Sequence, residues 1–215
     1  MDNQKHQTTR ILPKQLSAFA DNSADSISNL FISLKFTPNI ISFIALMLGL
    51  GAGILFAAAQ PLWAGIAIIL CGFFDVLDGQ VAAKTNKKSL FGAIFDSTLD
   101  RYSEFFIYLG IAYYFRDHWA LWLCFFTFFG SYMVSYTRAR AEGLGINCQI
   151  GIMQRAERIV LLALGSLLGS AFGAFDSVMI GVLIAIAAIS NFTAFQRIFY
   201  VKKYENLTKT HSQSN

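Results

Sequence analysis

Long apolar stretches separated by short polar segments dominate the chain from residue 38 onward. Five of these stretches contain no charged residue, and they cover residues 40–59, 61–74, 119–137, 159–175 and 177–196. A helix needs about 20 mostly apolar residues to cross the hydrocarbon layer of a membrane. Soluble helices of comparable length usually keep a polar face. The pattern therefore predicts an all-α, polytopic membrane protein.

Six transmembrane helices fit this pattern, at residues 39–58, 61–82, 91–115, 118–140, 153–174 and 176–198. The third is interrupted by several charged residues, but the apolar segments on either side are together long enough to span. The short connections near residues 59–60 and 115–117 favour antiparallel neighbours in a helical bundle. We expect three regions: a cytoplasmic segment at 1–38, a six-span domain at 39–198 and a polar cytoplasmic tail at 199–215.

The composition agrees with a membrane protein, since 55% of the residues are hydrophobic and only 14% are charged. Soluble domains average about 25% charged residues. The three cysteines, Cys71, Cys124 and Cys148, are widely spaced and two lie inside predicted spans. They indicate neither a disulfide framework nor a zinc site.

The basic residues predict the orientation. Fifteen of the 17 Lys and Arg residues fall on one side of the predicted spans, which the positive-inside bias assigns to the cytoplasm. The three tryptophans, Trp63, Trp119 and Trp122, fall at the opposite interface, as in an aromatic belt. We therefore expect a multi-pass protein of the cell (inner) membrane with both termini in the cytoplasm.

Two further patterns concern packing. Apolar residues recur at near-helical spacing before the first span, which predicts an amphipathic juxtamembrane helix; they are Leu12, Leu16, Phe19, Ile27, Leu30 and Phe31. The fifth span carries a ridge of Gly165, Gly169 and Gly173. Such a ridge favours close helix packing within the protomer, with dimerisation as the alternative.

Carboxylates gather near the cytoplasmic ends of the second and third spans, at Asp75, Asp78, Asp96 and Asp100. On a helix, Asp78 lies about 60° from Asp75, Gly79 about 40° and Ala82 about 20°. Successive steps from Gly92 to Asp96 and from Asp96 to Asp100 turn by only about 40°. Each span thus presents acidic groups beside positions with almost no side chain, an arrangement that suits a cation next to a bulky ligand.

The repulsion among these groups predicts a bound cation. Two like charges about 4 Å apart cost roughly 4 kcal/mol at an effective dielectric near 20. Carboxylate oxygens suit Mg²⁺, Mn²⁺ or Ca²⁺, and two divalent ions would balance four carboxylates and suit displacement at phosphorus. The residues alone leave two alternatives open. Intramembrane aspartates also serve ion- or proton-coupled transporters, and Asp100 could simply pair with Arg101.

The spacing D-x2-D-G-x2-A-x9-G-x3-D-x3-D resembles the signature of the CDP-alcohol phosphatidyltransferase family. Its seven positions are Asp75, Asp78, Gly79, Ala82, Gly92, Asp96 and Asp100. The resemblance implies a binuclear Mg²⁺ or Mn²⁺ site built from the four aspartates, with Asp100 as the general base. It also implies that a CDP-lipid binds along this motif, and that Gly79 and Ala82 let its cytidine nucleotide approach closely.

The sequence departs from the family pattern at one position, because Ala83 stands where the family has arginine. Lys84 follows, but on an unbroken helix it points about 180° from Asp75. Lys87 and Lys88 in the next loop are therefore the other candidates for binding the diphosphate of the CDP-lipid.

Arginines form a second cluster at the same membrane face, and they are Arg138, Arg140, Arg155, Arg158 and Arg197. Guanidinium groups suit phosphate oxygens, although positive-inside anchoring and an ordinary Arg138–Glu142 pair are the alternative. The two stretches around these arginines resemble the phosphatidylinositol-phosphate synthase branch of the family, except that Ala156 stands where branch members often have proline.

The resemblance to this branch implies CDP-diacylglycerol as donor and inositol phosphate, a phosphorylated polar alcohol, as acceptor, with release of CMP. Glycerol phosphate, serine and free inositol remain alternatives, as does the reverse polarity of CDP-choline or CDP-ethanolamine with diacylglycerol. As partners we expect these substrates, membrane lipids and a second copy in a homodimer, and no nucleic acid.

Overall fold

The computed structural model of the protein describes residue 25 and residues 27–213. Six helices follow one another: α2 (Pro38–Ala57), α3 (Pro61–Lys84), α4 (Leu90–Tyr114), α5 (Ala120–Gly143), α6 (Arg155–Ala171) and α7 (Phe175–Gln213). The loops that join them are short except for the α5–α6 loop at residues 144–154. The part of the chain that the structure describes contains no strand. The all-α prediction is confirmed, and each predicted span coincides with a helix.

Four helices are long and apolar enough to cross a membrane: α2, α3, α5 and the Phe175–Leu207 part of α7. The other two differ for physical reasons. The charged residues near the start of α4 lower its hydropathy, and α6 has only 17 residues. The chain is thus a polytopic helical membrane protein, and the count of six spans stays a prediction.

The ends of the predicted membrane domain differ in detail from the structure. Helix α7 continues well beyond residue 198 to Gln213, so most of the predicted polar tail is helical. At the other end, residues 27–33 form a helical segment. The predicted amphipathic positions Leu12, Leu16 and Phe19 lie outside the described residues. Ile27 and Leu30 are exposed, whereas Phe31 packs against Phe74 of α3.

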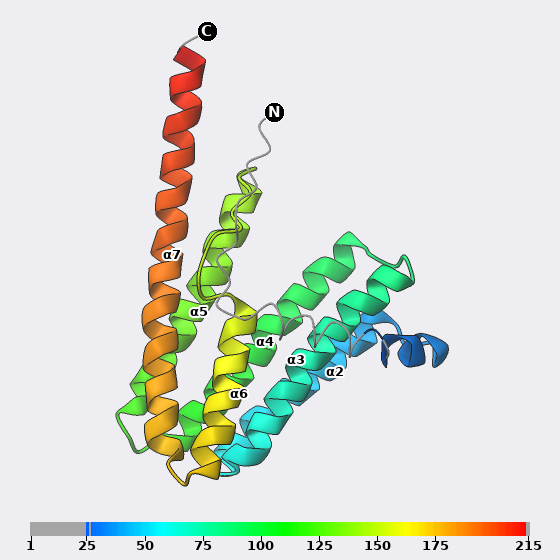
Figure 1. The fold of residues 1–215 in the computed structure, drawn as a ribbon, viewed down its shortest axis with the longest axis vertical. Coiled ribbons are helices and arrows are strands. Elements are labelled where there is room, and N and C mark those ends of the chain that lie inside the picture. Colours follow the sequence, from blue (N-terminus) through cyan, green and yellow to red (C-terminus); the bar gives the residue numbers. More distant parts are fainter. Residues whose placement is uncertain (1–24, 26, 214–215) are drawn as a thin grey trace.

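The helices form two groups of three (Figure 1). Helix α2 packs against both α3 and α4, and α7 packs against both α5 and α6. The groups contact each other through α3 with α6 and α4 with α5. In Figure 1 they meet at the lower end and diverge toward the upper end. We call them the first half (α2–α4) and the second half (α5–α7).

Close helix contacts inside each half depend on glycine. A Cβ atom on Gly110 of α4 would clash with the carbonyl oxygen of Gly53 on α2, and a Cβ atom on Gly53 would clash with the carbonyl oxygen of Phe106 on α4. Neither glycine can therefore carry a side chain. On α6, Cβ atoms at Gly165 and Gly169 would crowd residues of α7. This confirms the predicted packing for two residues of the glycine ridge, while Gly173 has a φ of +64° in the α6–α7 turn.

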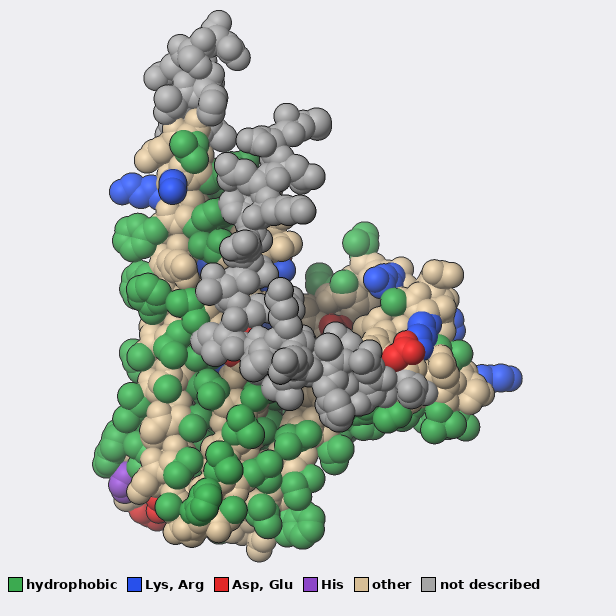
Figure 2. Space-filling model, in the orientation of Figure 1, with side chains coloured by type: hydrophobic (Ala, Val, Ile, Leu, Met, Phe, Trp, Pro, Cys, Tyr) green, Lys and Arg blue, Asp and Glu red, His purple; other side chains and the backbone are tan. Residues whose placement is uncertain are grey.

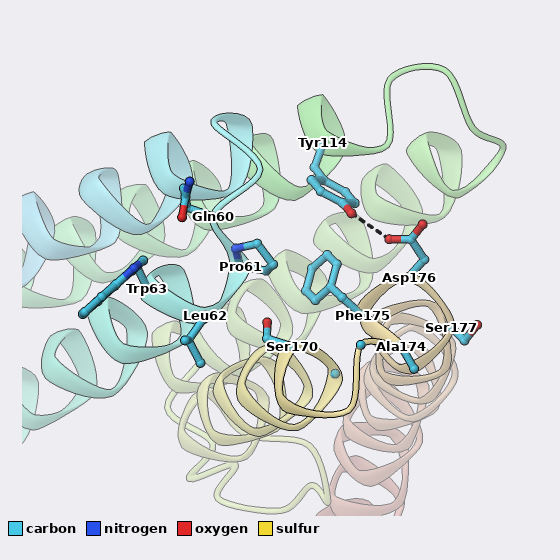
Figure 3. A pocket seen from close by; sticks show the side chains of 12 residues that line it. Gln60, Pro61, Leu62, Trp63, Tyr114, Ser170, Ala174, Phe175, Asp176 and Ser177 are labelled. Carbon is cyan, nitrogen blue, oxygen red and sulfur yellow. Dashed lines mark hydrogen bonds between the residues drawn. The ribbon is translucent and has the colours of Figure 1, made fainter.

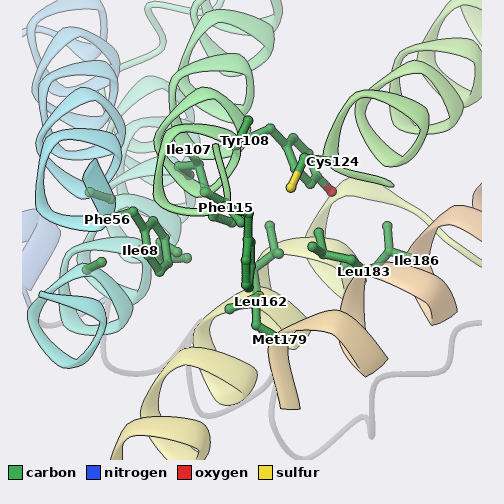
Figure 4. Packing of buried hydrophobic residues seen from close by; sticks show 14 of the residues in the cluster. Phe56, Ile68, Ile107, Tyr108, Phe115, Cys124, Leu162, Met179, Leu183 and Ile186 are labelled. Carbon is green, nitrogen blue, oxygen red and sulfur yellow. The ribbon is translucent and has the colours of Figure 1, made fainter. Parts of the chain in front are cut away.

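The main hydrophobic core joins the two halves at the lower end. Figure 4 shows Phe56, Ile68 and Ile107 of the first half near Leu162, Met179 and Leu183 of the second. These residues come from the late parts of α2 and α4, the early part of α3, the middle of α6 and the early part of α7. The motif aspartates lie at the opposite ends of α3 and α4, so the core fixes the halves without filling the space around the aspartates.

Candidate active site

The acidic motif converges in three dimensions. Carboxylate oxygens of Asp75, Asp96 and Asp100 all lie within 4.8 Å of one another. The two helices that carry them both pack against α2, which therefore sets their separation. The fourth carboxylate, Asp78, is buried and accepts a 2.6 Å hydrogen bond from the Ser42 hydroxyl of α2. We refer to these four carboxylates as the acidic cluster.

The acidic cluster fits a hard divalent cation. One oxygen of Asp96, Oδ1, is buried and has no hydrogen-bond partner among the described residues. Leaving a charged oxygen buried without a partner is costly, so such an atom is suited to a ligand that supplies positive charge. Oxygen ligands from several carboxylates are the donor set that Mg²⁺ and Mn²⁺ prefer.

Arg155 connects the acidic cluster to the second half. It is the first residue of α6, and its guanidinium lies 2.7 Å from Asp75 Oδ1 and 3.0 Å from Asp100 Oδ1. Its Nε is buried and has no hydrogen-bond partner within the described residues. Sequence analysis assigned Arg155 to acceptor binding, and the structure additionally places it in contact with two motif carboxylates.

The small residues of the motif differ in the space around them, and Gly79 has the most. A Cβ atom built on Gly79 would have no heavy atom of the described residues within 4 Å, so packing among these residues does not require glycine there. At Gly92 a Cβ atom would lie 3.0 Å from Ser89 Oγ, the oxygen that caps α4 by accepting from the Gly92 amide. Ala82 is half-buried near the end of α3.

The lysines after the motif differ in their surroundings. Helix α3 is unbroken through Lys84, as expected from the helical geometry. Lys84 Nζ lies 2.6 Å from Asp25 Oδ1 and donates hydrogen bonds to Ser28 Oγ at 2.8 Å and Asn29 Oδ1 at 3.0 Å. Lys84 therefore binds the N-terminal segment, whereas Lys87 and Lys88 are exposed in the α3–α4 loop.

The five arginines have unequal surroundings. Arg140 is exposed, and Arg138 forms a 2.8 Å pair with Glu142 one turn along α5. Arg197 is buried and donates to the backbone carbonyls of Ile150, at 2.8 Å, and Val134. Arg158 is fully buried and its fork is paired with Glu104 of α4.

Two residues of this region, Ser42 and Glu104, were not predicted from the sequence. Glu104 had a usable signal, because it follows Asp100 by four residues and so continues the helical face that begins at Gly92. Ser42 had none, since its contact with Asp78 depends on how α2 packs against α3.

A separate hollow of about 610 Å³ lies at the opposite end of the molecule (Figure 3). Its lining includes Trp63 and Tyr114, and the Tyr114 hydroxyl donates a 2.8 Å hydrogen bond to Asp176. The four motif aspartates are not among the lining residues. The hollow is therefore distinct from the acidic cluster.

Charge is distributed unevenly over the molecular surface. Figure 2 shows hydrophobic side chains over the lower part of the visible face, while Lys and Arg lie in its upper part. The acidic cluster lies toward the end of α3 and the start of α4. Arg138 and Arg140 lie near the end of α5 and Arg155 and Arg158 at the start of α6, whereas Arg197 lies near the middle of α7. The fold and the site together define a helical membrane protein in which clustered carboxylates, suited to a cation, lie next to arginines suited to phosphate.

The model of the CDP-alcohol phosphatidyltransferase family matches residues 35–195, and the chain belongs to this family. It is 39% identical over 180 residues to an archaetidylinositol phosphate synthase from Pyrococcus horikoshii, covering 83% of this chain and 90% of that one. It is 41% identical over 145 residues to the protein of the same name from Methanothermobacter thermautotrophicus, covering 67% and 72% of the two chains.

Solved structures share the fold. The phosphatidylinositol phosphate synthase of Mycobacterium tuberculosis, solved with CDP-DAG bound, matches with a TM-score of 0.75 at 22% identity. The match covers 82% of this chain and 92% of that one. The same enzyme in complex with manganese and citrate also has a TM-score of 0.75, at the same identity, covering 82% of this chain and 87% of that one.

Proposed function

We propose that this CDP-alcohol phosphatidyltransferase uses CDP-diacylglycerol as donor and inositol phosphate as acceptor, and releases CMP. The observation that carries the proposal is the direct contact of Arg155 with Asp75 and Asp100. It brings an arginine suited to phosphate next to the carboxylates suited to metal ions, at the junction of the two halves. A donor diphosphate and a phosphorylated acceptor need these two kinds of group side by side.

The relatives support the choice of substrates. The two archaeal relatives are named archaetidylinositol phosphate synthases, and a phosphatidylinositol phosphate synthase from Mycobacteroides abscessus is 28% identical over 155 residues, covering 68% of this chain and 69% of that one. These names share the inositol phosphate headgroup and differ in the lipid. The headgroup is accordingly the better supported part of the proposal.

Asp75, Asp78, Asp96 and Asp100 are assigned to hold two divalent ions, Mg²⁺ or Mn²⁺. Bound there, the ions would neutralise charge on the donor diphosphate and on the departing CMP. Gly79, Ala82 and Gly92 are assigned to the donor, because the open space at Gly79 allows the nucleotide to lie against α3. Lys87 and Lys88 are assigned to the diphosphate.

Asp100 is the proposed general base. It takes the proton of an acceptor hydroxyl, and the hydroxyl oxygen then attacks the lipid-side phosphorus of the donor. A new P–O bond to the acceptor forms, the P–O bond to CMP breaks, and CMP leaves with the electron pair. The products are CMP and a lipid phosphodiester.

The acceptor phosphate is assigned to the arginines, whose planar forks can bind two phosphate oxygens at once. Arg155 is the best placed, and Arg138 and Arg140 are accessible at the end of α5. Arg197 and Arg158 already bond protein groups. Of these two, we assign Arg197 to the rim of the phosphate site.

The setting of the enzyme is part of the proposal. The positive-inside bias supports a cytoplasmic site and cytoplasmic termini in the cell (inner) membrane. We further propose six spans across residues 39–198, a homodimer, and contact with membrane lipids along the exposed apolar helix faces. Membership of a transferase family argues against the transporter alternative.

The deciding experiment is an acceptor screen with purified protein in detergent containing Mg²⁺ or Mn²⁺. CMP release from CDP-diacylglycerol is measured with inositol phosphate, inositol, glycerol phosphate and serine. We expect inositol phosphate to be used best, and no release in excess chelator. Preference for an unphosphorylated alcohol would overturn the acceptor, and the absence of CMP release with all four would overturn the donor as well.

A further inference from the structure

A buried ion pair crosses between the two halves of the molecule. Arg158 of α6 donates through Nε to Glu104 Oε1 at 2.6 Å and through Nη2 to Glu104 Oε2 at 2.8 Å. Arg158 is 0% exposed and Glu104 is 4% exposed. The remaining nitrogen, Nη1, lies 3.5 Å from the carbonyl oxygen of Met153. Both charges are thus removed from solvent and bonded in a fork-to-fork geometry.

The pair connects helices that have other packing partners. Helix α4 packs against α2 and α5, whereas α6 packs against α3 and α7. Hydrophobic side chains join the halves toward the lower end. Near the acidic cluster, by contrast, polar groups provide the α4–α6 connections. They are the Glu104–Arg158 pair and the Asp100–Arg155 pair.

The two connections are in helical register. Glu104 lies one turn beyond Asp100 on α4, and Arg158 lies one turn beyond Arg155 on α6. Residues three or four apart on a helix lie on the same face. The Glu104–Arg158 pair therefore restricts both the position of α6 along its axis and its rotation about that axis, and with them the place of Arg155 at the acidic cluster. A shift of α6 along its axis would break the two pairs together.

We infer that Glu104 and Arg158 are positioning residues, which fix α6 so that Arg155 meets both the acidic cluster and the acceptor phosphate. The sequence predicted that Arg158 binds the acceptor phosphate. In this inference Arg158 acts through Glu104 instead. Its burial and its bonded fork leave it without a free edge for a phosphate. This inference rests on the acceptor role of Arg155 in the proposed function.

The first test measures the pair without any substrate. Thermal unfolding midpoints are compared for Glu104→Gln, Arg158→Gln and the double variant, with Asp117→Asn as the control for an exposed pair with Arg116. Each single variant leaves a buried charge without its partner, so we expect a loss of roughly 10 °C. The double variant should recover part of that loss, and the control should not change. Additive losses in the double variant would overturn the pairing.

The second test separates positioning from stability alone. Affinity for inositol phosphate is measured by calorimetry in the presence of CMP and Mn²⁺, well below all unfolding midpoints. We expect Glu104→Gln to weaken it about tenfold, the loss of one good charge-assisted bond. The affinity of this variant for CMP should stay within about twofold of the wild-type value. Arg158→Lys should weaken inositol phosphate binding less than Glu104→Gln does, because the positive charge is kept.

The outcomes distinguish the two claims. Unchanged inositol phosphate affinity together with a lowered midpoint would make the pair purely structural and overturn the positioning role. Wild-type protein that binds CMP but no phosphorylated alcohol would overturn the proposed acceptor instead, and the unfolding comparison would still report on the pair. If Glu104→Gln does not fold, Arg158→Lys supplies both measurements, because it retains the charge and loses only the fork.

Discussion

The guanidinium of Arg155 lies between Asp75 and Asp100, 2.7 Å from one carboxylate and 3.0 Å from the other. One arginine of the second half thereby partly neutralises carboxylates from two helices of the first half. The contact has two consequences. Arg155 lowers the repulsion within the acidic cluster, and in the proposed function it holds a guanidinium beside the carboxylates, at the place assigned to the acceptor phosphate.

We expect Arg155→Ala to impair acceptor use most strongly among the arginine variants. A charge-assisted hydrogen bond contributes about 1.5–3 kcal/mol, so losing one weakens acceptor use by about ten- to a hundredfold. Arg155→Lys should rescue only part, because one ammonium cannot span Asp75 and Asp100 as a planar fork does. Initial rates over a range of inositol phosphate concentrations test this. If Arg155→Ala reduces the rate only mildly and no more than Arg140→Ala, the arginines would serve only to orient the protein in the membrane.

We expect Asp75→Asn, Asp78→Asn and Asp96→Asn each to abolish turnover while the protein still folds. Losing one carboxylate relieves repulsion among like charges and weakens cation binding at the same time. CMP release and the unfolding midpoint should be measured together, with Asp117→Asn at the far end of the molecule as the control. Full activity of the three variants, or of wild-type protein in excess chelator, would contradict the metal assignment.

Much of the fold followed from local sequence patterns. The charge-free stretches predicted α2, α3, α5, α6 and α7, and the apolar segments on either side of its charged residues predicted α4. A turn of 100° per residue placed the motif aspartates on one face of α3 and one face of α4. The same geometry predicted that Lys84 points away from the acidic cluster, and the structure pairs it with Asp25 instead. These features depend on contacts within one helix or on its length, which the sequence records directly.

The cross-helix pairs were beyond such reasoning. Arg155 and Arg158 are one turn apart and looked equivalent in sequence, yet one contacts the acidic cluster and the other is buried against Glu104. Which partner each finds depends on how α6 is placed relative to α4, far away along the chain. Helix α7 also continues beyond the predicted span, because loss of hydrophobicity ends a span but does not end a helix.

Gly79 and Gly110 are small for different reasons. Gly79 is assigned to donor binding, whereas Gly110 allows α4 to pack closely against α2. We expect Gly79→Ala to fold normally, since an added Cβ meets no heavy atom of the described residues within 4 Å, but to raise the Michaelis constant for CDP-diacylglycerol. Gly110→Ala should instead destabilise the protein, because its Cβ would clash with the Gly53 carbonyl oxygen. Unfolding midpoints and donor kinetics of the two variants test the contrast. Normal donor kinetics in Gly79→Ala would remove Gly79 from the nucleotide site.

The last prediction concerns which lysine compensates for Ala83. Lys84 is engaged by Asp25, Ser28 and Asn29, so Lys84→Met should leave the Michaelis constant for CDP-diacylglycerol nearly unchanged. Its effect should be local, since the contacts of Asp25, Ser28 and Asn29 with α3 are lost. Faster hydrogen exchange, or faster protease cleavage, in this segment would report that change.

Lys87 and Lys88 provide the matched comparison, because they are exposed in the loop that joins the two motif helices. Lys87→Met or Lys88→Met should raise the Michaelis constant for the donor, since each removes a positive charge near the proposed diphosphate position. Hydrogen exchange of residues 25–33 should not change in these two variants. A strong and selective loss of donor use in Lys84→Met, with Lys87→Met and Lys88→Met unaffected, would assign the diphosphate to Lys84. In that case the last turn of α3 must open when the donor binds, because a continuous helix holds Lys84 on the face opposite the acidic cluster.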